Sequence, residues 1–134
     1  MRKLFLVLVF AASLIGCEKD ENPSTIDATI IGRWHAVGFE EVVLYEFTAD
    51  KRYTIYSSDG TFPTLEEFMA ENPELRGHDW SYDGEVVVVD LNFGNFSRRI
   101  PTFRCDNYAI DWIGEDGTTG DTYFREGYDM SECN

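Results

Sequence analysis

The chain holds few residues whose types and spacing support catalysis or metal binding. Its two histidines, His35 and His78, lie far apart in sequence, and only Asp79 stands beside either of them. A zinc site needs three or four converging ligands, so we assign both histidines to structural or surface positions. Neither a Gly-rich phosphate loop nor a nucleophile elbow occurs. We therefore predict a protein that is not an enzyme and that carries no metal or cofactor.

Cys17 is the first of three cysteines and follows a characteristic amino-terminal segment. Arg2 and Lys3 are positive, and residues 4–14 are apolar apart from Ser13. This apolar run is much shorter than the ~20 residues that span a bilayer as a helix. A short positive segment followed by a short apolar run is typical of a secretory signal peptide.

The run Leu14-Ile15-Gly16-Cys17 resembles the lipobox of bacterial lipoproteins. The resemblance implies that Cys17 receives a diacylglycerol, that residues 1–16 are removed, and that the new amine is acylated, with palmitate as the expected chain. Each buried CH2 of such chains gains about 0.8 kcal/mol, enough in sum to hold the protein on a membrane. An ordinary secretory signal with a chance cysteine, or an uncleaved anchor, is the alternative.

An acidic tether, residues 17–29, would follow the leader. Its start, Glu18–Asn22, resembles the export signal with which one phylum of Gram-negative bacteria sends lipoproteins to the outer face of the outer membrane. The resemblance implies a lipid-anchored protein of the outer membrane, at the cell surface. A solvated linker of no further meaning explains the same composition.

Length and charge restrict the remaining classes of function. The 134-residue chain without its leader is long enough for one domain, and we place that domain at residues 30–134. The chain has 25 acidic and 11 basic residues, a net charge of −14, which argues against nucleic acid as a partner because phosphate binding needs clustered cations.

With Cys17 lipidated, Cys105 and Cys133 remain to form a disulfide in an oxidising compartment. Two free thiols are the alternative.

Short apolar or alternating runs separated by turn residues predict eight strands, and hence an all-β sandwich or barrel. These strands are expected at 32–37, 42–48, 52–57, 78–82, 85–91, 96–104, 108–113 and 122–126. Asp83-Gly84 predicts a type I′ hairpin. One short helix follows the third strand, since Thr64 and Glu67 form a capping box and Asn72-Pro73 ends the run.

The Gly-x-Trp motif of Gly32 and Trp34, on the first strand of an eight-stranded protein, resembles the signature of the lipocalins. The resemblance implies an up-and-down antiparallel barrel in which Trp34 closes the floor and a basic residue of the last strand, here Arg125, stacks across it. The short strands and the helix after the third strand depart from the family, in which the helix mostly follows the last strand.

Barrel geometry brings several predictions together. In an up-and-down barrel the start of strand one and the ends of strands six and eight share one end, so Trp34 lies beside Arg125 and Cys105 lies within reach of Cys133. A cation over an indole ring is worth roughly 0.5–2 kcal/mol. The tight turns then fall on the floor, and the longer loops, including the helix-bearing segment from Asp59 to Gly77, form a mouth that faces away from the membrane.

The interior of an eight-stranded barrel is either filled by side chains or holds one small ligand. The alternation of side chains along the strands predicts these lining or core residues: Tyr45, Phe47, Tyr53, Ile55, Tyr108, Ile110 and Trp112. Arg98 and Arg99 are adjacent in the sixth strand, so one of them, taken as Arg99, should point inward to a ligand carboxylate. An internal ion pair, or a bulge that turns both arginines outward, is the alternative.

Two functions of different classes follow. The first is a lipid-anchored binding protein that holds a small apolar or amphipathic ligand in the barrel. The second is a protein-interaction or envelope-assembly module with a filled core, which uses the acidic, helix-bearing rim. Carboxylates expected on that rim are Glu40, Glu41, Asp59, Glu66, Glu67, Glu71, Glu115, Asp116 and Asp121; they are a calcium or cationic-partner site or, alternatively, solvated loop charge.

Overall fold

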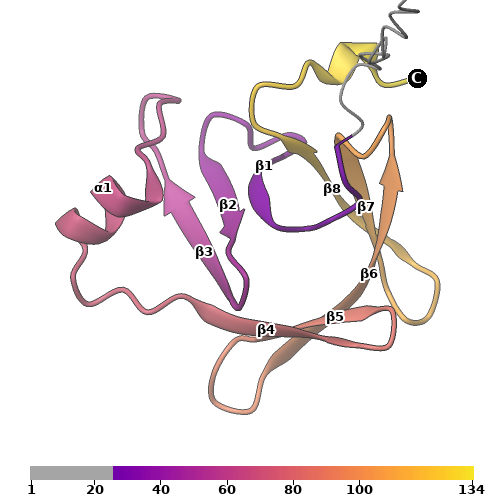
Figure 1. Ribbon diagram of the computed structural model, residues 1–134, viewed down its shortest axis with the longest axis horizontal. Coiled ribbons are helices and arrows are strands. Elements are labelled where there is room, and N and C mark those ends of the chain that lie inside the picture. Colours follow the sequence, from indigo (N-terminus) through magenta and orange to yellow (C-terminus); the bar gives the residue numbers. More distant parts are fainter. Residues whose placement is uncertain (1–25) are drawn as a thin grey trace, which may run out of the picture.

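A computed structural model describes residues 26–134 and shows a closed antiparallel β-barrel (Figure 1). The eight strands are hydrogen-bonded in sequence order and β8 pairs with β1. This confirms the predicted eight-stranded, up-and-down all-β fold with one short helix after the third strand. The strands are β1 (Gly32–Ala36), β2 (Val43–Phe47), β3 (Lys51–Tyr56), β4 (His78–Asp83), β5 (Val86–Asp90), β6 (Phe96–Arg104), β7 (Ala109–Ile113) and β8 (Thr119–Arg125). The predicted leader, Cys17 and most of the tether lie outside the described residues.

The core lies between the inward faces of the strands, as period-2 alternation requires. Trp34 belongs to this core and is fully buried, and its indole N–H donates to the Ile30 carbonyl at 2.7 Å. The buried members of this core are Ile30, Trp34, Ala36, Val43, Phe47, Val87, Val89, Ile110, Trp112 and Tyr123. Apart from Ile30, which precedes β1, these residues come from β1, β2, β5, β7 and β8, so the core joins strands that are far apart in the sequence and stabilises closure of the barrel.

A second apolar layer covers the outside of the barrel at β8, β1, β2 and β3. His35 packs between the rings of Phe62 and Phe124, with centroids 5.5 and 5.3 Å away. Leu44 and Ile55 pair across β2 and β3 and are both fully buried. The covering segment is the insertion, residues 57–77, which joins β3 to β4 and contains the helix α1 (Leu65–Glu71).

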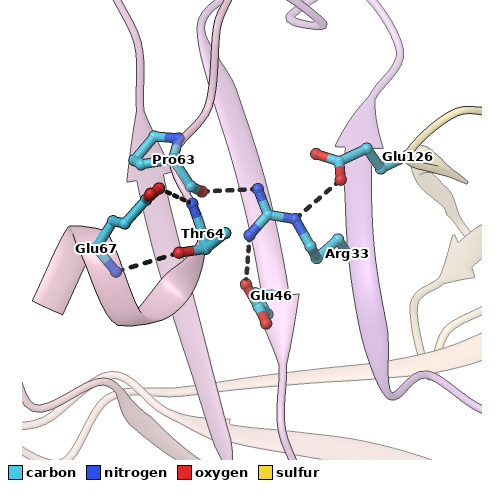
Figure 2. Close-up of polar contacts among 6 residues, drawn as sticks. All are labelled: Arg33, Glu46, Pro63, Thr64, Glu67 and Glu126. Atoms are coloured by element: carbon cyan, nitrogen blue, oxygen red, sulfur yellow. Dashed lines mark hydrogen bonds and ion pairs between the residues drawn. The ribbon is translucent and has the colours of Figure 1, made fainter.

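The insertion folds back over the outer face instead of standing on the rim that we expected. Arg33 holds it there: its guanidinium donates to the Pro63 carbonyl at 2.9 Å and pairs with Glu46 at 2.7 Å and Glu126 at 3.1 Å (Figure 2). The predicted capping box is confirmed, because Thr64 and Glu67 each accept from the other's backbone N–H. Helix α1 lies outside the barrel beside β3 (Figure 1) and has no buried residue.

The hairpin between β4 and β5 differs from the prediction by one residue. Asp83 pairs with Val86, so the two turn residues are Gly84 and Glu85. Gly84 has φ +60°, whereas Glu85 is not among the residues with positive φ. Positive φ at the first turn position alone is the pattern of a type II′ turn, in which glycine takes that position, rather than type I′.

Cys105 and Cys133 form the predicted disulfide, with their Cα atoms 5.4 Å apart. Cys105 begins the β6–β7 turn, and Cys133 directly follows the short 3-10 helix η1 (Met130–Glu132), which comes after β8. The bridge therefore ties the carboxy-terminal tail to the end of the barrel that carries Arg125.

Candidate ligand cavity

A cavity of about 290 Å3 lies inside the barrel. Its lining comes from β2, β3, β5, β6, β7 and β8, so closure of the barrel is what creates it. The lining residues are Tyr45, Phe47, Arg52, Val87, Val89, Ser97, Arg99, Trp112, Gly120, Asp121 and Tyr123. The volume is just below the range for small-molecule sites, roughly 300–1,000 Å3, so only a small ligand would fit.

Aromatic rings form much of the wall. Tyr45 and Tyr123 stack with centroids 4.9 Å apart, and Trp112 meets Tyr123 edge-on at 5.6 Å. Phe47 stacks against Trp112 at 6.1 Å. Burial raises the pKa of the Tyr123 hydroxyl above its ordinary value, so this phenol stays neutral at physiological pH.

Two arginines complete the lining. The Arg52 guanidinium lies 5.5 Å from the centre of the Tyr45 ring, and Arg99 donates to the Arg98 carbonyl at 3.0 Å. Arg98, its neighbour in β6, does not line the cavity and pairs with Glu115 at 2.8 Å and Asp83 at 3.0 Å. The strand therefore separates the two adjacent arginines: Arg99 lines the cavity where it opens to solvent and is itself exposed, whereas Arg98 lies away from the cavity.

Two buried donors of the lining have no hydrogen-bond partner among the described residues. They are Nε of Arg52 and Nε1 of Trp112. Trp112 is only 6% exposed, and a buried donor without an acceptor costs free energy. Both nitrogens have almost no accessible surface, so their lack of partners is a cost to the folded barrel and not a feature that the cavity presents to a ligand.

Four of the predicted ligand residues line this cavity: Tyr45, Phe47, Arg99 and Trp112. Tyr53, Ile55 and Tyr108 do not. Tyr53 and Ile55 are on the outer face of β3, where the Tyr53 ring lies so close to Gly77 that a Cβ there would come within 2.8 Å of it. Tyr108 stacks on Tyr128 at 4.7 Å, beyond the end of β6.

Sequence reasoning missed the inward face of β3. Its inward residues Arg52 and Thr54 are polar and its outward residues Tyr53 and Ile55 are apolar, because the insertion buries the outer side. Tyr123 was also missed, although its position two residues before Arg125 places both on the same face of β8. The two-residue spacing from Arg125 could have identified Tyr123 as an inward residue.

The floor of the barrel is closed as predicted. The Arg125 guanidinium lies 4.3 Å from the centre of the Trp34 ring, and the two residues pair in register between β1 and β8. Gly32 has φ +134°, and a Cβ there would lie 3.0 Å from Arg125 Nη1. Glycine is therefore needed in this motif both for its backbone conformation and for the approach of the arginine.

Comparisons with protein-family models, with curated proteins and with solved structures find no match to this chain. The lipocalin and lipoprotein resemblances thus remain predictions.

Across residues 26–134, no three His, Cys, Asp or Glu side chains gather as a metal site would require. Over the same residues, no helix has the length and apolar character needed to cross a bilayer.

Proposed function

We propose that this protein is a lipid-anchored binding protein of the bacterial outer membrane that holds a small amphipathic ligand inside its barrel. The observation that carries the proposal is the cavity of about 290 Å3 inside the barrel, which combines stacked aromatic rings with two arginines, Arg52 and Arg99, that form no ion pair among the described residues. A barrel filled by side chains would not have this volume. The lipobox-like run that ends at Cys17 supports the anchor.

The test is to identify what the protein carries. Residues 18–134, which contain the whole described barrel, are purified without detergent from the periplasm of the expression host, and native mass spectrometry compares the intact mass with that of the unfolded chain. We expect a small molecule that is lost on unfolding. Trp112→Leu, which alters the cavity wall, should abolish its retention. A chain without added mass that also takes up no small aromatic compound would contradict ligand binding.

A second candidate is a protein-interaction module, favoured by helix α1. The helix has no buried residue and carries Glu66, Glu67 and Glu71, so its outer surface is free to meet a cationic partner. Charge reversal at Glu66 and Glu71 would abolish such an interaction and leave ligand retention unchanged, which separates the two functions.

A further inference from the structure

The basic residues of this acidic protein differ in whether they pair with a carboxylate. Although acidic residues outnumber basic residues 25 to 11, not every cation has a carboxylate. Ion pairs are formed by Arg33, Lys51, Arg98 and Arg104. Arg125 stacks on Trp34 and donates to backbone carbonyls, and Arg76 also donates to backbone carbonyls at the surface.

Arg52 and Arg99 differ from these residues, because both line the cavity and neither forms an ion pair within the described part of the chain. The cavity has one carboxylate, that of the exposed Asp121, which is not in ion-pair contact with either arginine. Two cations against one anion give the lining a net positive charge in a protein whose total charge is −14.

The guanidinium groups of the two arginines set the kind of ligand. Arg99 is exposed and Arg52 is partly exposed, and both line the cavity. An ionised carboxylate or sulfonate has only acceptors, and hydrogen bonds from a guanidinium to such a group are stronger than neutral ones. An anionic group is therefore the chemical complement of these two guanidinium groups.

The walls define the rest of the ligand. Tyr45, Phe47, Trp112 and Tyr123 present rings to the cavity, and Val87 and Val89 add aliphatic surface. We propose that the ligand is a small organic acid with a flat, ring-bearing body, its anionic group held by Arg52 and Arg99 and its ring packed among these side chains. This inference rests on the proposed ligand-binding function and names the chemical class of the ligand.

Two probes of equal shape test the charge preference. Naphthalenesulfonate and naphthalenesulfonamide share the ring and differ in the anionic charge. Titration calorimetry with residues 18–134 should show the sulfonate binding more tightly by roughly tenfold or more, the scale of one hydrogen bond to a charged group. A naphthoate should behave like the sulfonate, because the shared feature is the anion.

Adjacent residues supply matched controls. Arg99→Gln and Arg52→Gln should each lower the affinity for the sulfonate by about tenfold and leave the affinity for the sulfonamide unchanged. Arg98→Gln and Lys51→Gln remove the same charge from neighbouring positions that pair with surface carboxylates, and they should leave both affinities unchanged. Thermal unfolding of each variant shows whether the barrel is intact.

The outcomes separate this inference from the function on which it rests. Equal affinity for the two probes in the parent would overturn the anionic ligand and leave the binding function standing. So would an equal loss in Arg98→Gln and Arg99→Gln, because net charge rather than the cavity would then explain binding. If neither probe bound and no molecule were retained after purification, both proposals would fail.

Discussion

At the scale of single residues, Arg125 joins separate segments of the chain at the floor of the barrel. Its guanidinium covers the Trp34 ring and donates to the carbonyls of Thr29 at 2.9 Å and Asn107 at 3.1 Å. Desolvation lowers its pKa from the ordinary value, yet an arginine stays charged at any physiological pH. One side chain thus joins the segment before β1, the β6–β7 turn and the end of β8.

The contact between Trp34 and Arg125 can be measured by a double-mutant cycle. Trp34→Ala removes a fully buried ring and should lower the free energy of unfolding by about 3–5 kcal/mol. Arg125→Ala should cost less, and the two losses should couple because the arginine loses its stacking surface with the indole. Denaturant unfolding is the measurement. Additivity within about 0.3–0.5 kcal/mol would count against the contact.

Gly32 offers a second prediction at this scale. Gly32→Ala places a Cβ 3.0 Å from Arg125 Nη1 at φ +134°, and we expect a loss of roughly 1–3 kcal/mol in the free energy of unfolding. Gly38→Ala is the control, since Gly38 also has a positive φ but no atom within 4 Å of the added Cβ. Equal losses in the two variants would show that backbone conformation alone, and not the packing of Arg125, requires glycine.

At the scale of elements, the insertion buries the outer face of β3 and so makes both faces of the sheet apolar in places. Alternation predicts that the two faces of β3 differ, and this is confirmed. It does not say which face is inside, because Phe62 and the rest of the insertion give the outer face an apolar layer of its own. Tyr53 and Ile55 were therefore assigned to the wrong face, whereas Tyr45 and Phe47 on β2 were assigned correctly.

Arg33 should control the stability of the insertion. Arg33→Gln removes the bond to the Pro63 carbonyl and the pairs with Glu46 and Glu126, leaving Glu46 partly buried without its cation. We expect faster amide exchange in residues 57–77, with local protection reduced by about 1–2 kcal/mol after allowance for partial exposure. Hydrogen exchange with mass detection measures this.

Arg98→Gln is the comparison for that experiment, because it breaks ion pairs at the surface far from the insertion. Its exchange profile in residues 57–77 should match that of the parent. Unchanged exchange in Arg33→Gln would mean that the apolar contacts of Phe62, rather than the arginine, hold the insertion in place.

At the scale of the whole molecule, the predictable features are those set by connectivity and by strong local motifs. Gly32, Trp34 and Arg125 predicted the closed barrel, and the same arrangement predicted the disulfide between Cys105 and Cys133. The cavity depends instead on how far inward side chains fall short of filling the interior. Filling also depends on which residues of neighbouring strands face one another. At β3 and β4, for example, Arg52 pairs with His78, and no local pattern in the sequence encodes that register.

The attachment of the whole molecule to a membrane is predicted from Cys17 alone, which lies outside the described residues. Cys17→Ala should move the protein from the membrane fraction to the soluble fraction, because the acyl chains would then have no attachment site and each chain contributes about 0.8 kcal/mol per buried CH2. Fractionation and immunoblotting of cells that express the parent and the variant measure this. Cys133→Ala is the matched control, since it removes a cysteine that forms the disulfide instead and should leave the folded protein on the membrane. A Cys17→Ala variant as membrane-bound as the parent would mean that the leader stays as an uncleaved anchor, or that another part of the molecule holds the bilayer.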